Sequence, residues 1–210
     1  MSRPDQSAYL AHFTKNGKEY NPEQDRTNLS IDQMSAFERL INILKEKKIH
    51  TTNMPWTNKK AVCFTECPWG SLLRHAENYS PYGIGFKKRF IYNRNGNPVI
   101  YANPNMFNEE EWGPHVLPFV TPFVPYYASE KIKNQEPFNG KFLDYSHERE
   151  WRVIRDLSFQ YNNIQFVILG KVEDLEQIPE EIIKDIGIEK FLYMDVYRKI
   201  EELWPVHLME

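Results

Sequence analysis

The stretch D-Y-S-H-E-R-E-W-R-V-I-R-D, residues 144–156, alternates charged and apolar side chains in the manner of a β-strand. Successive side chains of a strand point to opposite faces, so Glu148, Glu150 and Arg152 are predicted to share one face. Two carboxylates about 6–7 Å apart repel each other unless something cationic lies between them. A positively charged or hydroxyl-rich ligand would relieve that repulsion. The alternative is a solvated face on which the three charges neutralise one another.

Composition restricts the class of protein. The 210 residues are 41% hydrophobic and 14% aromatic, which suits one domain, residues 1–210, with a sizeable core. A net charge of −3 argues against a general nucleic-acid binder, because neutralising phosphates requires a basic surface. Cys63 and Cys67 have no further cysteine partners, which argues against a disulfide framework or a zinc ribbon.

The chain shows neither a targeting segment nor a membrane span. Residues 1–16 lack the basic start and the apolar run of a signal peptide. The longest apolar stretch, residues 116–128, contains three prolines and is too short to cross a bilayer. We therefore expect a soluble cytoplasmic protein that does not contact a membrane.

Local patterns predict the principal elements. Ser35 and Glu38 have capping-box spacing, and the apolar residues that follow recur at helical intervals, so a helix is expected from residue 35 to about residue 48. A second helix is expected to begin at Pro68. A short helix should run from Pro179 to residue 186 with Gly187 after it. Strands are expected at residues 8–14, 61–65, 83–92, 98–101, 149–155, 164–169 and 190–197.

The remaining segments are less regular. Residues 49–60 look like a loop, and the Asn95-Gly96 pair predicts a hairpin turn between the strands 83–92 and 98–101. Pro98 favours an edge position for the second of these strands. Prolines divide residues 103–139 into kinked helical pieces. The predicted fold is α+β, a single domain with a mixed, mostly antiparallel sheet of about six or seven strands and flanking helices.

Three short segments carry candidate functional groups. His12 and Thr14 share a face of the first strand and would be able to hydrogen-bond a sugar hydroxyl; a histidine bonded to backbone is the plainer alternative. Cys63 has no evident base, so a buried structural thiol fits better than a nucleophile. Residues 82–86, Y-G-I-G-F, lack the third glycine of a dinucleotide fingerprint and precede a strand, so their glycines instead allow a close approach.

The basic run of residues 87–89, K-K-R, follows directly. Such runs are usually a solvated face, and phosphate binding is the alternative. No cluster of metal-binding acids supports a nuclease.

The order of these segments resembles a known family. An H-x-T strand, a helix, a C-F-T-E strand, a proline-started helix and the P-Y-G-I-G-F, N-P-V-I-Y and H-E-R-E-W-R strands together resemble the AbiGi-type abortive-infection (phage resistance) family of bacteria. They also resemble a related bacterial domain of unknown function with an E-x-E-W-R strand. The resemblance extends from about His12 to Leu169.

Both families are more distantly similar to the ADP-ribosyltransferase fold, including the DarT toxins. That likeness implies an ADP-ribosyltransferase-like domain with NAD as co-substrate. It assigns His12 and Thr14 to ribose binding and Phe64 or Tyr82 to stacking on nicotinamide. It gives the catalytic role to Glu150, with Glu148 beside it and Arg152 keeping Glu150 ionised. The first strand departs from this pattern, because it has no H-G-T or H-G-S triplet and the chain has no S-T-S segment.

Two functions of different classes follow from the resemblance. The first is an NAD-dependent ADP-ribosyltransferase-like effector in phage defence, acting on an unidentified target macromolecule. The second is a catalytically silent antitoxin or binding partner of a cognate toxin. In the second case Trp151 would lie in the core and the charges of residues 148–152 would pair outside it.

Overall fold

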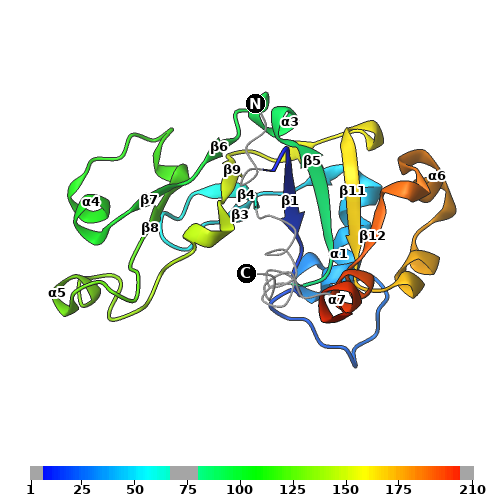
Figure 1. Cartoon of the computed structure of the whole chain (residues 1–210), viewed down its shortest axis with the longest axis horizontal. Helices are drawn as coiled ribbons and strands as arrows, with labels where there is room; N and C mark the ends of the chain where they lie inside the picture. Colours follow the sequence, from blue (N-terminus) through cyan, green and yellow to red (C-terminus); the bar gives the residue numbers. More distant parts are fainter. Residues whose placement is uncertain (1–6, 67–79, 204–210) are drawn as a thin grey trace.

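The computed structural model describes residues 7–66 and 80–203, and these form a body and a projecting lobe. Figure 1 shows the body around one four-stranded sheet, the lobe at the opposite end, and a second four-stranded sheet between them. We define the lobe as residues 99–145. The predicted helix beginning at Pro68 lies outside the described residues.

The first sheet has the strand order β1-β5-β11-β12, comprising β1 (Tyr9–Phe13), β5 (Gly83–Lys87), β11 (Ile164–Leu169) and β12 (Phe191–Tyr193). Only the pair β11–β12 is parallel. The prediction of an interior strand at β11 is confirmed. Gly85 meets β11 closely, since a Cβ atom there would lie 2.2 Å from the ring of Phe166. The glycine therefore serves the close approach of a neighbouring strand.

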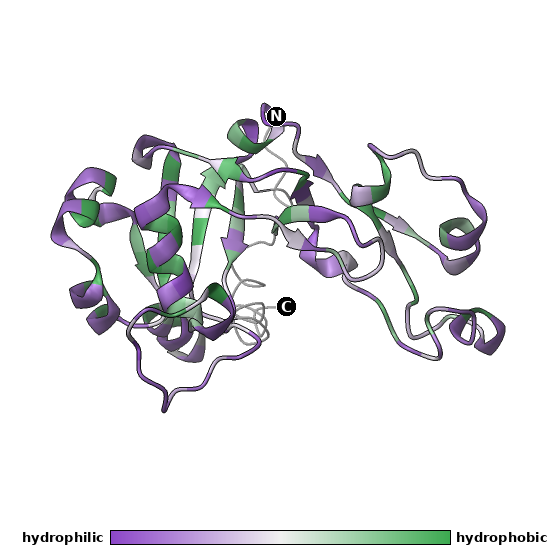
Figure 2. Ribbon diagram, turned by 180° about the vertical axis from the view of Figure 1, so that it is seen from behind, coloured by the Kyte–Doolittle hydropathy of each residue, from purple (hydrophilic) through white to green (hydrophobic). Residues whose placement is uncertain are grey.

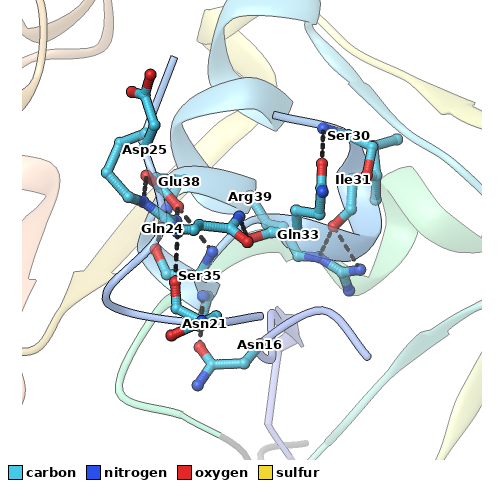
Figure 3. Close-up of polar contacts among 12 residues, drawn as sticks. Asn16, Asn21, Gln24, Asp25, Ser30, Ile31, Gln33, Ser35, Glu38 and Arg39 are labelled. Atoms are coloured by element: carbon cyan, nitrogen blue, oxygen red, sulfur yellow. Dashed lines mark hydrogen bonds and ion pairs between the residues drawn. The ribbon is translucent and has the colours of Figure 1, made fainter. Parts of the chain in front are cut away.

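Helix α1 (Ala36–Glu46) covers this sheet and begins with the predicted capping box. The Ser35 side chain accepts a hydrogen bond from the Glu38 amide at 3.2 Å, and the Glu38 carboxylate accepts one from the Ser35 amide at 2.7 Å. Figure 3 shows the surrounding contacts, including the Asn16 side chain, which accepts from the Ala36 amide at 2.8 Å. The helix ends at Lys47, whose backbone is left-handed.

The second sheet has the order β3-β4-β9-β6 and is antiparallel throughout. Its strands are β3 (Thr52–Asn53), β4 (Lys60–Phe64), β9 (Trp151–Val153) and β6 (Asn97–Pro98). A bridge between Ala11 and Thr65 joins it to the first sheet. The predicted strand at residues 61–65 and the edge position of Pro98 are confirmed. The loop predicted at residues 49–60 is wrong in part, because the segment contains two short strands. Strand β3 pairs with β4, and β2 (Lys48–Ile49) pairs with β10 (Leu157–Ser158).

Two predicted strands are shorter than expected, because a helix begins before the predicted end of each. The strand from residue 83 ends at Lys87, where α3 (Lys88–Tyr92) begins. The last strand ends at Tyr193, where α7 (Met194–Leu203) begins with the buried Met194. The predicted hairpin is also wrong: β5 already has two neighbours in the first sheet, and β6 pairs with β9.

Residues 144–156 differ most from the prediction. Residues 146–148 form a 3-10 turn, and Arg149 has φ 45°, a left-handed conformation. Regular alternation therefore begins only after Arg149, and β9 has three residues.

The lobe is built on a parallel pair, β7 (Ile100–Ala102) and β8 (Val120–Pro122), with helices α4 (Pro104–Glu109) and α5 (Glu130–Lys133). The kinked helical pieces predicted for residues 103–139 are thus confirmed in part, since strand β8 lies among them. The lobe has its own small core of Val124, Phe138 and Leu143.

The body contains the large core. Figure 2 shows apolar residues concentrated in the strands of the first sheet. Helix α6 (Glu180–Ile186) packs there and ends at Gly187, as predicted. The α+β class and the mostly antiparallel pairing are confirmed. The strands lie in several sheets, and no single sheet of six or seven strands occurs among the described residues. The 3-10 turns are Ile31–Gln33, Leu117–Phe119, Ser146–Glu148, Tyr161–Asn163, Val172–Gln177 and Ile188–Lys190.

Candidate functional site: the Glu150–Arg152 network

Glu150 and Arg152 form a bidentate ion pair at the junction of body and lobe. Arg152 Nε donates to Glu150 Oε1 at 2.8 Å, and Nη2 donates to Oε2 at 2.9 Å. Parallel bonds of this kind are both strong and directional. The predicted pairing of these two residues on one face is confirmed.

The other donors of Arg152 reach the lobe. Its Nη1 donates to the carbonyl oxygens of Pro118 at 2.8 Å and Val120 at 3.3 Å, and Nη2 donates to the Thr121 hydroxyl at 2.6 Å. A guanidinium has five N–H groups, and these contacts with the two to Glu150 employ all five. Arg152 is 4% exposed. We call Glu150, Arg152, Pro118, Val120 and Thr121 the Glu150–Arg152 network.

The network perturbs neighbouring groups. Burial opposes the charge of Arg152, but the bonds to Glu150 outweigh it and raise the pKa of the guanidinium. Cys63 pairs directly with Arg152 across β4 and β9, so its side chain lies on the same face. Burial and then the Glu150 carboxylate raise the pKa of the Cys63 thiol well above its ordinary value. A protonated thiol is a poor nucleophile, so this location agrees with the expected structural role.

Tyr101 closes the network on the lobe side. Its hydroxyl accepts from the Glu150 amide at 3.3 Å and donates to the Tyr145 carbonyl at 3.0 Å. Burial raises the pKa of Tyr101 to about 12. The backbone carbonyl of Glu148 accepts from the Thr65 hydroxyl at 2.7 Å. The segment before β9 is thus fastened to β7 of the lobe and to the residue that follows β4.

A second buried carboxylate lies at Glu66, which sequence reasoning missed. Glu66 is 7% exposed, and its two oxygens accept from Lys88 Nζ at 2.5 Å and Trp151 Nε1 at 2.8 Å. Lys88 also lies 5.6 Å from the centre of the Trp151 ring. Within the basic run 87–89, Lys87 and Arg89 are exposed and Lys88 is committed to this pair. In the sequence, the only sign of this buried acid is that Glu66 directly follows the mostly apolar residues 61–65.

The residues expected to bind ribose are engaged in holding the fold. His12 Nδ1 lies 2.8 Å from the Cys63 carbonyl oxygen, and burial lowers the pKa of its imidazole. The Thr14 hydroxyl, 4% exposed, donates to the Ala36 carbonyl at 2.7 Å. It thereby ties the end of β1 to the start of α1.

The two aromatic candidates lie in the core or against it. Phe64 is 2% exposed, and its ring centre is 5.9 Å from that of His12 and 6.3 Å from that of Phe86. Tyr82 is half-buried beside Phe37, and burial together with the Asp174 carboxylate raises the pKa of its hydroxyl to about 12. Trp151, which the binding-partner interpretation places in the core, packs against that core, and Val153 is buried in it.

The candidates therefore fall into two groups. His12 lies on the Phe64 side of β4, whereas Glu150 and Arg152 lie on the Cys63 side, because neighbouring residues of a strand face opposite ways. His12 and Glu150 thus lie on opposite sides of β4. The Thr14 hydroxyl already donates to the Ala36 carbonyl, so it would bind a ribose only as an acceptor. Ligand binding by these residues stays a prediction.

Two further absences apply to residues 7–66 and 80–203. These ranges contain no group of three or more His, Cys, Asp or Glu side chains arranged to hold a metal ion. They also contain no helix of the length and apolar character that crossing a membrane requires.

No curated protein and no solved structure matches the chain. Residues 33–112 match the family described as "Putative abortive phage resistance protein AbiGi, antitoxin". The match includes α1, β4, β5 and α4, and of the candidate site residues it includes only Phe64 and Tyr82. Over these 80 of its 210 residues, the chain is similar to the AbiGi abortive phage resistance family.

Proposed function

We propose that this chain is an antitoxin-type protein of an abortive phage-resistance system and that it acts by binding a partner protein. The observation that carries the proposal is the match of residues 33–112 to a family described as an antitoxin. Binding would protect the cell by keeping the partner inactive, and it requires no chemistry of this chain.

The Glu150–Arg152 network supports a structural use of the acidic strand. Both oxygens of Glu150 accept from Arg152, and every N–H of Arg152 has a protein acceptor. A carboxylate and a guanidinium committed in this way hold two parts of a protein together without a ligand. This arrangement is the one expected of a binding module.

A growth assay tests the proposal. We expect expression of the chain alone to leave growth unchanged, and its co-expression with the growth-arresting protein encoded beside it to restore growth. Growth arrest by the chain alone, abolished by Glu150→Gln, would instead identify it as the effector. Circular dichroism of the Glu150→Gln protein is needed alongside, because this change disturbs the ion pair with Arg152.

The NAD-dependent effector remains the second proposal. It rests on the Glu150 carboxylate, which Arg152 holds in one orientation through two hydrogen bonds. Incubating the purified chain with labelled NAD and cell lysate tests it directly. Transfer of label that Glu150→Gln abolishes would establish this function, and the absence of NAD binding and turnover would refute it.

A further inference from the structure

Three aromatic side chains of the lobe are more than half exposed. Tyr126, Tyr127 and Phe142 are 78%, 68% and 61% exposed. The rings of Tyr126 and Tyr127 lie 5.2 Å apart. The bridge between Val124 and Leu143 brings Phe142 alongside the start of this pair. We call these three residues the aromatic patch.

The patch is mounted on a fixed frame. Val124 and Leu143 exchange backbone hydrogen bonds of 3.0 and 2.9 Å, and both side chains are buried with Phe138 in the core of the lobe. Exposed aromatic rings on an ordered frame lose little conformational freedom on binding and often act as anchors of an interface. Scattered apolar residues need no explanation, but a cluster on a projecting lobe does.

Charge on the lobe indicates what kind of partner would fit. Residues 99–145 contain six acidic and three basic side chains, whereas the rest of the chain contains 23 of each. The net charge of −3 therefore lies on the lobe. Six of its acids are exposed, namely Glu109, Glu110, Glu111, Glu130, Glu136 and Asp144.

The patch already receives a cation from its own chain. Lys133 Nζ lies 5.1 Å from the centre of the Phe142 ring and 3.2 Å from a Glu130 oxygen. An aromatic face flanked by a carboxylate suits a lysine or arginine side chain, through the ring quadrupole and the salt bridge together.

We propose that the aromatic patch is the docking surface for a partner protein whose contact surface is rich in arginine and lysine. The inference rests on the proposed antitoxin function and names where the partner would bind. The acidic lobe would steer a basic protein toward the patch, and the rings would anchor it. The same charge disfavours a nucleic acid, and two acidic lobes would repel each other.

The test uses the full chain and, as probe, the growth-arresting protein encoded beside it. Titration calorimetry at about 0.05 and 0.5 M salt compares the wild type with the triple variant Tyr126→Ser, Tyr127→Ser, Phe142→Ser. We expect the triple variant to bind at least about tenfold more weakly. The matched control is Tyr92→Ser, because Tyr92 is 62% exposed on α3 in the body, and its affinity should equal that of the wild type.

A second pair of variants tests the charge. Replacing Glu109, Glu110 and Glu111 by glutamine should weaken binding at low salt and flatten its salt dependence. Replacing the exposed Glu173, Glu176 and Glu202 of the body by glutamine should do neither. Equal effects of the two sets would show a general influence of net charge and would overturn the role of the lobe.

The outcomes separate the inference from the function. If the wild type neither binds the probe nor restores growth, the antitoxin function fails and its docking surface with it. If the wild type binds and restores growth but the patch variant does so equally well, the docking surface is wrong and the function stands. A wild-type dimer in light scattering that the patch variant loses would make the patch a contact between copies of the chain.

Discussion

The body buries one large cluster of apolar side chains, whereas the separate core of the lobe consists of Val124, Phe138 and Leu143, and a polar network joins the lobe to the body. Burial of apolar area is the main favourable term in folding, so we expect the large core of the body to supply most of the stability of the molecule. The lobe is joined to the body in part by hydrogen bonds from a single guanidinium, that of Arg152. It also exposes the rings that a larger core would have covered.

This difference divides the molecule into a scaffold and a presenting surface. Regions with few buried contacts open at lower free energy than the core. A lobe of this kind is suited to binding, because its exposed apolar side chains are not buried in its own core and can contact a partner.

Removing Arg152 should have the largest effect on this arrangement. Arg152→Met leaves the Glu150 carboxylate and two buried carbonyl oxygens without their donor, which costs about 3–5 kcal/mol. Urea unfolding measures the loss, and limited proteolysis should cut the lobe before the body. The control Arg152→Lys keeps the charge but loses the fork, and should recover only part of the stability. Stability unchanged by Arg152→Met would show that the lobe is held by other contacts.

Truncating a buried phenylalanine should cost more in the body than in the lobe. Phe86→Ala removes a ring packed against Phe64, Phe90 and Phe159, and should lower the free energy of unfolding by about 3–5 kcal/mol. Phe138→Ala should cost less, because the cluster around Phe138 is small and its partly buried neighbours Trp56, Phe107 and Ala128 can move into the space. Hydrogen exchange should place the Phe138 effect in the lobe alone. An equal global loss would mean that the two regions unfold as one unit.

Removing the cap of α1 should have a moderate effect confined to the body. Ser35→Ala deletes the acceptor for the Glu38 amide and should cost about 1 kcal/mol. Ser35→Asp, which restores an acceptor at that position, is the matched control. Chemical denaturation of the three proteins checks the expectation, and equal stability of all three would contradict it.

The smallest expected effect concerns pH. His50 lies 2.9 Å from both Glu46 and Asp156 carboxylate oxygens, and these bonds raise its pKa above the unfolded value of about 6.5. The stabilisation is therefore fully present below pH about 6.5 and is lost as the pH rises through the higher folded pKa. Asp156, with a pKa lowered to about 2, stays charged in this range.

The cluster is nearly half exposed, so we expect a few tenths of a kcal/mol at most. Thermal melts of the wild type and His50→Gln at several pH values should diverge most at the acidic end. A gap between them that widens with rising pH would reverse the assigned sign.

Elements with a strong local signal were predictable from the sequence. The capping box of α1, the apolar run of β11 and the glycine after α6 each depend on residues within one or two turns of chain. The pairing of Glu150 with Arg152 was equally predictable. The expected place of Glu148 on the same strand face was wrong, because Glu148 lies in a 3-10 turn and the left-handed Arg149 separates it from β9. The match of residues 33–112 likewise agrees with the family resemblance read from the sequence.

Only the tertiary structure decided where those residues lead. Because Arg149 has a left-handed backbone, β9 starts later than predicted, and β5 ends earlier than predicted, at Lys87. The sequence does not indicate that the acceptors of Arg152 come from residues 118–121, more than thirty positions away. The Glu66 contacts with Lys88 and Trp151 are equally remote. Periodicity records which way a side chain faces within its own element, whereas its partner is set by long-range pairing of strands, which that periodicity does not encode.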